Sequence, residues 1–379
     1  MIRINRFWVF IGVAFALWSC DFQTSKKSQI APNQDNKLQY AQNFKWVAHP
    51  DYDLLEVVSL RSKEVFRIVV IDSAQQSPKV PYNLVLQRPV ERIIATATPH
   101  IAALEMLNGL DRVVGFPQPE YIYSEAARSR IQNKTIAPIG INNELNLEKI
   151  ITLKPELFIG FEVDGINPDY TRLQQMDIPL VLIQDWLEES PLAKAEWLLF
   201  FGVVLGEKER ALELFKSIEK RYNELKQKVP KSMVQPAQVV SGSVYKDQWY
   251  APGGKSFFAQ FLKDCGVNYL LHSNSEKGSI SLSIEKLLLE GQSADVWLCP
   301  GSFDSYEALG KQYPMLQAIK PYQKKQIFTY KKEVVGQSRF IPYFEQAPYH
   351  PDRVLEDLLH IFYPDEFKQN FWHYFTPLQ

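Results

Sequence analysis

The sequence predicts an α/β fold of two lobes, each with a mostly parallel sheet flanked by helices, joined by one long helix and preceded by a β-rich arm. The chain has 379 residues, which is enough for two domains. Short buried strands alternate with helices in both halves, and this order is typical of parallel sheets. A helical stretch at 191–228 separates the halves, although a surface helix of a single domain would show the same periodicity.

The composition is that of a folded soluble protein. Apolar residues make up 46% of the chain and charged residues 22%. The formal net charge of −1 gives no overall attraction to nucleic acid, and we expect none to bind. Aromatic residues reach 13%, which suits a large apolar ligand and ordinary core packing equally well.

The first 37 residues indicate export. Arg3 and Arg6 precede an apolar run, Phe7–Trp18, that spans about 18 Å as a helix, too short to cross a bilayer. We therefore expect a signal peptide at 1–19. Leu17-Trp18-Ser19-Cys20 resembles the lipobox of bacterial lipoproteins, which implies lipidation of Cys20, an inner-membrane preference from Asp21, and a periplasm-facing protein. An ordinary cleavage site beside an incidental cysteine is the alternative. The polar segment 20–37 is predicted to be a flexible tether.

Residues 38–190 divide into two regions. Three runs rich in β-forming residues predict the arm at 38–86, at 44–47, 54–60 and 65–71. The N-terminal lobe is predicted at 87–190. Its strands are expected at 92–95, 113–115, 157–160 and 180–183, and its helices at 99–108, 147–153 and 168–176.

The linking helices at 191–228 and a C-terminal lobe at 229–379 complete the prediction. We expect Gly202 and Gly206 to break the helical stretch, which leaves a long helix at 207–228 with one apolar stripe. In the C-terminal lobe, strands are expected at 237–241, 295–298 and 326–329. Helices are expected at 255–264 and 284–290, with closing helices from Asp352 and from Pro364.

The two halves contain a similar segment. Asn146-Leu-Glu-Lys-Ile-Ile-Thr-Leu corresponds to Ser283-Ile-Glu-Lys-Leu-Leu-Leu-Glu, and a buried strand follows each after a turn. Glu148 and Glu285 therefore hold the same place in a first helical turn. A carboxylate there is stabilised by the helix dipole, which is one explanation. The other is that two exposed carboxylates on matching lobes bind a partner with two basic sites.

Four segments carry a resemblance to a known family. They are Pro89-Val-Glu-Arg-Ile-Ile-Ala-Thr-Ala-Thr-Pro-His, Leu107-Asn-Gly-Leu-Asp-Arg-Val-Val-Gly, the segment from Asn146, and Pro252-Gly-Gly-Lys-Ser. Over residues 88–362 the chain resembles the substrate-binding proteins of iron-siderophore and cobalamin ABC transporters. The resemblance implies two α/β lobes joined by one long helix. It also implies that Glu148 and Glu285 dock on arginines of an ABC permease, which works with its ATPase.

The resemblance also implies a ligand site in a cleft lined by loops at strand ends. Aromatic side chains with one arginine suit a ferric siderophore or a cobalamin-type corrinoid. The positions implied are Thr98, His100, Phe116, Tyr121, Trp186, Trp249, Tyr250, Arg339, Tyr343 and Phe344.

Other chemistries find little support. Gly253-Gly254-Lys255-Ser256 lacks the earlier glycine of a phosphate-binding loop, and the six histidines have no metal-site spacing. We therefore expect no cofactor and no resident metal, with any metal carried inside the ligand. No Gly-x-Ser-x-Gly motif occurs, so we expect no enzymatic activity. We also expect a monomer. A lipid-anchored hydrolase and a ligand-relay lipoprotein remain the alternatives. For Cys265 and Cys299, we expect buried free thiols in preference to a disulfide between them.

Overall fold

The computed structural model describes residues 38–58, 64–72, 78–141, 144–161, 167–230 and 235–379. The predicted signal peptide (1–19), the lipidation site Cys20 and the tether (20–37) lie outside these residues. Among the described helices, none combines the length and the apolar character that crossing a membrane requires.

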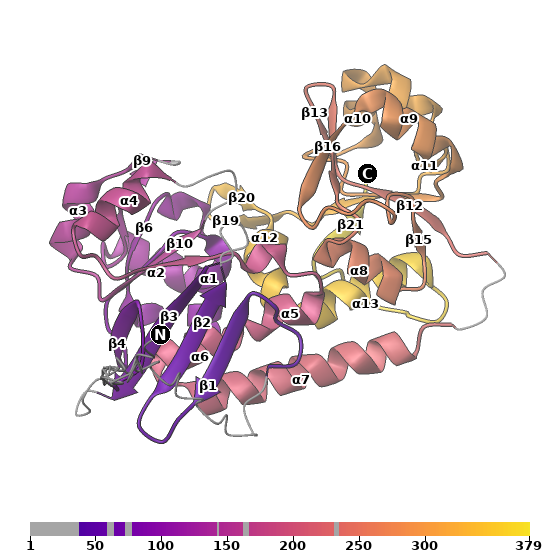
Figure 1. The fold of residues 1–379 in the computed structure, drawn as a ribbon. Coiled ribbons are helices and arrows are strands. Elements are labelled where there is room, and N and C mark those ends of the chain that lie inside the picture. Colours follow the sequence, from indigo (N-terminus) through magenta and orange to yellow (C-terminus); the bar gives the residue numbers. More distant parts are fainter. Residues whose placement is uncertain (1–37, 59–63, 73–77, 142–143, 162–166, 231–234) are drawn as a thin grey trace, which may run out of the picture. The chain divides into compact units, whose positions relative to one another are not determined.

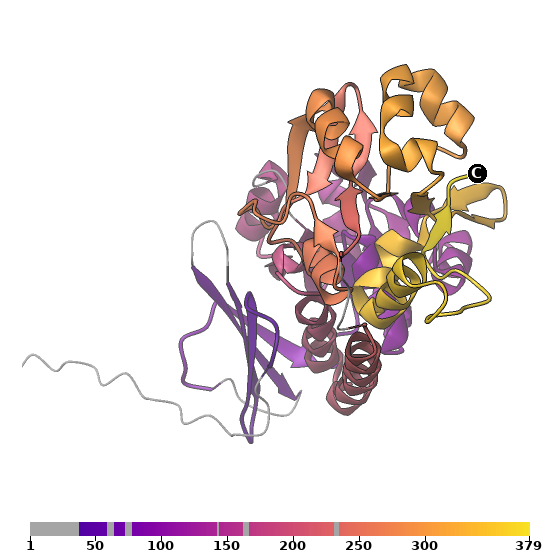
Figure 2. The ribbon, with the colours of Figure 1, turned by 90° about the vertical axis from the view of Figure 1, so that its right-hand side faces the viewer.

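The arm is a four-stranded sheet in the order β1-β2-β3-β4 (Figure 2). Its strands are β1 (Phe44–Ala48), β2 (Asp53–Val58), β3 (Val65–Asp72) and β4 (Leu84–Arg88). The first three match the predicted runs and pair antiparallel. The sequence analysis missed β4, which pairs parallel to β3. Only one of the five β4 residues, Leu86, is fully buried, so β4 has little of the apolar signal by which strands are found in sequence.

The inner face of the arm packs on the N-terminal lobe. Phe44, Trp46 and Ile68 belong to the same apolar core as the helix α6 (Leu198–Leu205). The Phe44 ring lies 5.0 Å from that of Trp197, and Figure 1 shows β1 and β2 beside α6. The arm thus shares the core of the lobe rather than standing apart from it.

The N-terminal lobe contains an all-parallel sheet in the order β11-β10-β5-β6-β7. Its strands are β5 (Ile93–Ala95), β6 (Val113–Phe116), β7 (Ala137–Pro138), β10 (Leu157–Phe161) and β11 (Leu180–Ile183). Its helices are α1 (Thr98–Met106), α2 (Glu125–Gln132), α3 (Leu147–Leu153) and α4 (Pro168–Gln175). A small antiparallel pair joins β8 (Gly140–Ile141) to β9 (Glu144–Leu145). The α/β order matches the prediction, while α2 and β7 were not foreseen.

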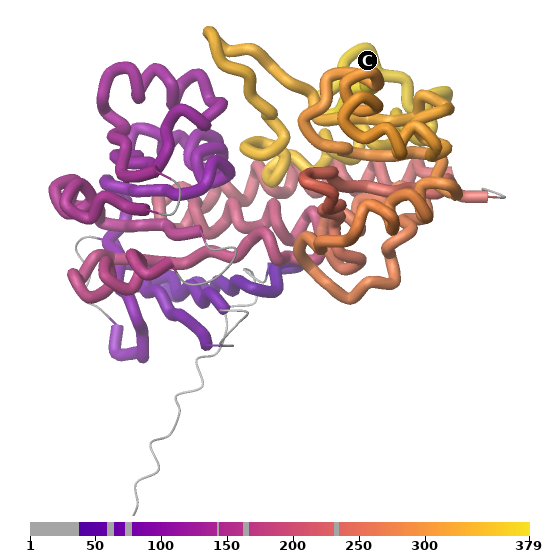
Figure 3. Tube along the Cα trace, turned by 90° about the horizontal axis from the view of Figure 1, so that it is seen from above, coloured from indigo at the N-terminus to yellow at the C-terminus, as the bar shows by residue number. Residues whose placement is uncertain are grey.

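Three helices link the lobes: α5 (Pro191–Glu196), α6 and the long α7 (Lys208–Gln227), visible as a straight rod in Figure 3. Gly206 ends α6 in the left-handed conformation, with φ 78°, as predicted. The expected break at Gly202 was wrong, because Gly202 lies inside α6. A Cβ atom there would lie 2.4 Å from Cβ of Ala211, so this glycine allows α6 and α7 to pack closely.

The C-terminal lobe has a sheet in the order β15-β12-β17-β18-β21, parallel except for the last pair. The strands are β12 (Gln238–Ser241), β15 (Asn268–Tyr269), β17 (Val296–Leu298), β18 (Ile327–Tyr330) and β21 (Phe375–Pro377). The helices are α8 (Phe257–Asp264), α9 (Ile284–Ser293), α10 (Tyr306–Gln312), α11 (Lys320–Gln323), α12 (Pro342–Gln346) and α13 (Pro351–Phe362). A three-stranded sheet contains β13 (Ser243–Tyr245), β14 (Gln248–Pro252) and β16 (Ser279–Ser283). A separate two-stranded sheet contains β19 (Glu333–Val335) and β20 (Ser338–Phe340).

The predicted closing helix from Pro364 was wrong. The chain after α13 forms turns, and β21 then completes the sheet by pairing antiparallel to β18. The carboxylate of Asp357 on α13 holds this return, because it accepts the backbone N–H groups of His373, Tyr374 and Phe375.

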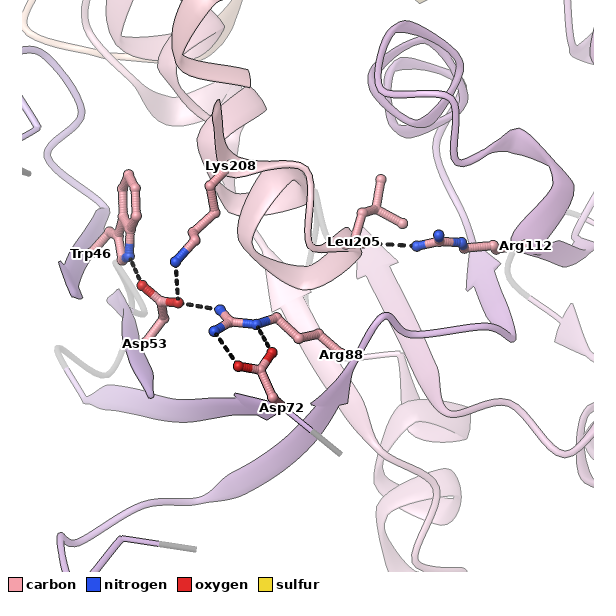
Figure 4. Close-up of polar contacts among 7 residues, drawn as sticks. All are labelled: Trp46, Asp53, Asp72, Arg88, Arg112, Leu205 and Lys208. Carbon is pink, nitrogen blue, oxygen red and sulfur yellow. Dashed lines mark hydrogen bonds and ion pairs between the residues drawn. The ribbon is translucent and has the colours of Figure 1, made fainter. Parts of the chain in front are cut away.

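An ionic cluster fastens the arm to the linking helices (Figure 4). The carboxylate of Asp53, 1% exposed, accepts hydrogen bonds from the Trp46 indole at 2.7 Å and from Lys208 Nζ at 3.1 Å. Arg88 donates to Asp53 as well and also binds Asp72 at 2.7 Å. Because Trp46 and Arg88 come from the arm and Lys208 from α7, the cluster joins the two regions.

Two buried carboxylates fix the chain just before β1. Glu196 on α5 accepts the backbone N–H groups of Gln39, Tyr40 and Ala41 at 2.7–2.9 Å. Glu188 accepts those of the next two residues and the Trp197 indole. Burial raises the pKa of both carboxyl groups, and the hydrogen bonds lower it again in part.

A segment of the C-terminal half contacts the N-terminal lobe. Figure 3 shows the β19–β20 hairpin extending from the yellow part of the chain. The Tyr123 hydroxyl donates to Glu333 at 2.5 Å, and Arg128 lies 4.7 Å from the Phe340 ring centroid. Glu345 on α12, 2% exposed, accepts the backbone N–H groups of Tyr123 and Ser124. We call residues 333–345 the clasp.

Candidate functional site

A cavity of about 490 Å³ opens at the carboxyl ends of the C-terminal strands. Its wall comes from the residues that follow β12, β17 and β18, which is the edge where parallel α/β sheets hold ligands. The helices α8 and α12 add aromatic side chains. The residues before the C-terminal lobe that line it are Trp186, Pro191 and Lys194.

Several aromatic rings line the cavity wall. Tyr330, at the end of β18, lies 4.6 Å from the Tyr343 ring and 5.0 Å from the Phe344 ring, measured between centroids. Phe257 and Phe258 from α8 and Tyr250 from β14 also line the cavity. Rings at these distances offer faces on which a flat or bulky apolar ligand can stack.

Four of the ten predicted ligand positions line this cavity: Trp186, Tyr250, Tyr343 and Phe344. The other six do not line it: some are buried in the core, and others lie on the surface away from the cavity. Trp249 is fully buried, because neighbouring strand residues alternate between faces, and its indole donates to the Ser241 carbonyl at 3.0 Å. Arg339 lies on β20, where its guanidinium is 67% exposed and pairs with Asp304 at 3.4 Å.

The four remaining positions belong to the N-terminal lobe. His100 on α1 is fully buried and lies 5.6 Å from the Phe201 ring, and Phe116 is 4% exposed within the core. Thr98 is half-buried at the start of α1, and Tyr121 is 64% exposed. The structure therefore places none of these side chains on the cavity wall.

The sequence analysis missed the two cations of the cavity, Lys194 and Lys277, together with Tyr330. The sequence contained one signal for Lys194. Lys194 and Glu196 are the two charged residues in the apolar stretch Pro191-Leu-Ala-Lys-Ala-Glu-Trp-Leu-Leu-Phe-Phe. An isolated charge in an apolar run is rarely buried without a role. The Tyr330 signal was its place directly after a parallel strand.

A group of buried polar side chains lies beside the cavity floor. His100, Asp185 and Tyr349 are each at most 1% exposed, and their side-chain polar atoms have no hydrogen-bond partner among the described residues. Burial lowers the pKa of His100 to about 4, so its imidazole is neutral at pH 7. Burial also lowers the pKa of Lys194, while the nearby charge of Asp185 raises it.

The two glutamates predicted to dock on a partner occupy equivalent positions. Asn146 caps α3 by accepting the Lys149 N–H, and Ser283 caps α9 by accepting the Lys286 N–H. Glu148 and Glu285 follow in the first turns, and both are exposed. A hydrogen bond from Ser283 lowers the pKa of Glu285. Glu285 is therefore both exposed and ionised at pH 7.

Metal and redox chemistry have no ready site among the described residues. No group of three histidine, cysteine, aspartate or glutamate side chains there could hold a metal ion. Cys265 and Cys299 are both buried free thiols. Burial raises the pKa of Cys299 to about 12, which keeps this thiol in the cavity wall protonated and unreactive.

Comparison with known proteins gives the following matches. Residues 93–334 match the family model described as periplasmic binding protein. An uncharacterized lipoprotein of Methanocaldococcus jannaschii is 24% identical over 304 residues, which cover 77% of this chain and 69% of the relative.

Solved structures of similar fold include three binding proteins. A periplasmic heme binding protein from Pseudomonas aeruginosa has a TM-score of 0.57 at 18% identity, covering 73% of this chain and 94% of its own. A periplasmic vitamin B12 binding protein of Vibrio cholerae has a TM-score of 0.52 at 18% identity, covering 74% and 99%. A periplasmic binding protein from Veillonella parvula reaches 0.58 at 15% identity, covering 88% and 97%. At these identities the likeness establishes the shared fold.

Proposed function

Because the chain belongs to the periplasmic binding protein family, we propose that it is the substrate-binding lipoprotein of an ABC importer. In this proposal it captures a ferric siderophore or a cobalamin-type ligand and delivers it to the permease, without catalysing a reaction. The observation that carries the proposal is the cavity at the strand ends of the C-terminal lobe, whose aromatic wall suits a bulky chelate.

The ligand site in this proposal differs from the one implied by the sequence. Trp186, Tyr250, Tyr343 and Phe344 line the cavity and are kept as ligand-binding residues. We propose that the protein has no resident metal and that any metal arrives within the ligand.

The partners and the location belong to the same proposal. Exposed Glu148 and Glu285 would dock on basic residues of the permease, which acts with its ATPase. Lipidation of Cys20 would hold the protein, as a monomer, on the periplasmic face of a bacterial membrane, with the inner membrane favoured by Asp21. The lipoprotein name of the Methanocaldococcus jannaschii relative supports this anchor.

Tryptophan fluorescence tests the proposal directly, because Trp186 lies in the cavity wall. A form starting at Asp21 would be titrated with ferric catecholate, hydroxamate and citrate chelates, cobalamin, cobinamide and heme, each with an inner-filter control. We expect saturable quenching by one class at submicromolar concentration, and loss of most of the signal in Trp186→Phe. No response to any compound would contradict the proposal and favour a hydrolase or a ligand relay.

A further inference from the structure

One ammonium group in the cavity wall lacks a carboxylate partner. Lys194, on α5, is 8% exposed and lines the cavity, and its Nζ lies 4.5 Å from the centroid of the Phe257 ring. Within the described ranges no carboxylate forms an ion pair with it. The contact with Phe257 is a cation–π contact, which stabilises a buried cation only in part.

The second cation of the cavity is already neutralised. Lys277 pairs with Glu189 at 2.5 Å, and the Lys277 side chain remains 34% exposed. Among the described residues that line the cavity, none is an aspartate or a glutamate. The cavity wall thus offers a ligand one ammonium group without a direct ion pair and no carboxylate, although the charge of the buried Asp185 lies close enough to act on Lys194.

The buried polar group beside Lys194 does not supply the missing partner. Within the described ranges the two carboxylate oxygens of Asp185 have no hydrogen-bond partner, so Asp185 acts on Lys194 as a nearby charge and not through a direct ion pair. The imidazole of His100, also unpartnered there, is neutral at pH 7. A desolvated ammonium that faces an open cavity is stabilised strongly by an anion that enters it.

The surroundings of Lys194 limit the shape of that anion. Phe257 packs under the ammonium group, and Trp186, Tyr250 and Phe344 are further rings of the same wall. An anionic group attached to a flat, apolar body would place its charge on Lys194 and its body against the rings.

We infer that the ligand is an anionic chelate with a flat or aromatic body, and that a carboxylate or another anionic oxygen of this ligand pairs with Lys194. The inference rests on the proposed function and narrows it. It selects catecholate and porphyrin chelates, which combine anionic oxygens with a flat body, over citrate chelates, neutral or cationic corrinoids and hydroxamates. Lys194 takes the role that the sequence analysis gave to Arg339.

The test compares four proteins with matched ligands. Wild type, Lys194→Met, Lys194→Arg and Lys263→Met would be titrated with the ferric catecholate, citrate and hydroxamate chelates, cobinamide, heme and heme dimethyl ester. Lys263 is an exposed lysine on α8 outside the cavity, so its variant controls for the change in net charge. Heme dimethyl ester keeps the ring but lacks the carboxylates. Circular dichroism would check that each variant is folded.

We expect wild type to bind an anionic chelate best and Lys194→Met to bind it at least about tenfold more weakly. Lys194→Arg should retain more of the affinity than Lys194→Met, and Lys263→Met should match wild type. If heme is the ligand, wild type should bind the ester as weakly as Lys194→Met binds heme. Equal affinity of wild type and Lys194→Met, or a preference for citrate, cobinamide or a hydroxamate, would overturn this inference while leaving the binding function standing. Binding of no compound by wild type would overturn both.

Discussion

The two lobes share a plan but divide the work unequally. Each has a five-stranded sheet, and each presents a short capped helix with an exposed glutamate in its first turn. The C-terminal lobe, however, supplies nearly all of the described cavity wall, while only Trp186 of the predicted ligand residues of the N-terminal lobe lines it. The N-terminal lobe instead packs its core against the arm. A repeated architecture therefore does not imply a shared ligand surface.

The largest expected effect concerns the exposed glutamate that each lobe presents in a first helical turn. Reversing both charges, Glu148→Lys with Glu285→Lys, should abolish ligand uptake into cells or proteoliposomes that contain the permease, because both docking contacts become repulsive. Ligand affinity in solution should not change.

The matched control for docking is Glu209→Lys with Glu213→Lys, which makes the same charge change on the exposed face of α7. Its uptake should equal that of wild type. An equal loss of ligand affinity in the docking variant would show that these glutamates are not a docking pair.

The second prediction concerns the arm, which only the N-terminal lobe carries. Asp53→Ala should lower the free energy of unfolding by about 3 kcal/mol, because it leaves Arg88 and Lys208 near each other without their shared carboxylate. Denaturant unfolding measures this. Asp72→Ala removes a carboxylate from the same arginine, but Asp72 is 58% exposed, so its effect should stay near 0.5 kcal/mol. Similar losses in the two variants would refute a special role for the buried contact.

The third prediction addresses the clasp between the lobes. Burial raises the pKa of Glu345 to about 7, although its two hydrogen bonds from backbone N–H groups lower it. A carboxyl group with a raised pKa stabilises the folded protein most below its unfolded pKa, and this contribution is lost as the pH rises through about 7. The stability of wild type relative to Glu345→Gln should thus fall by about 2 kcal/mol between pH 5 and pH 8.

Thermal or denaturant unfolding of both proteins across this pH range checks the sign. The comparison with Glu345→Gln cancels the titration of other groups. A difference that stays constant, or that grows as the pH rises, would show that Glu345 does not carry a raised pKa.

The smallest expected effect is a difference in ligand affinity between two ring deletions, one in each lobe. Phe344→Ala should weaken binding about fivefold, which corresponds to about 1 kcal/mol for one lost ring contact. Tyr121→Ala should change it less than twofold. Both side chains are more than half exposed, at 53% and 64%, so the pair differs mainly in position. An equal loss from Tyr121→Ala, measured by fluorescence titration, would show that the ligand also contacts Tyr121 of the N-terminal lobe.

The sequence predicted the elements of this fold better than the places of its side chains. The strand 180–183 and the helix 147–153 were predicted to the residue, because apolar spacing and an Asn cap mark them locally. The missed strand β4 has only one fully buried residue and so carries little of that signal.

The candidate site was harder to predict for a physical reason. Neighbouring residues of one strand face opposite sides, so Tyr250 lines the cavity while Trp249 enters the core. Whether Lys194 faces solvent or a cavity depends on α8, which lies more than fifty residues further along the chain and supplies Phe257. Local patterns contain no information about such contacts.

The carboxylates of Glu188 and Glu196 also decide where the polypeptide can be shortened. They hold five backbone amides of residues 39–43, and these amides should exchange with deuterium far more slowly than those of an ordinary loop. A chain that begins after residue 43 would remove all five of these donors and leave Glu188 with the Trp197 indole. A soluble fragment intended for crystallisation should therefore retain this short stretch, even though it lies before the first strand.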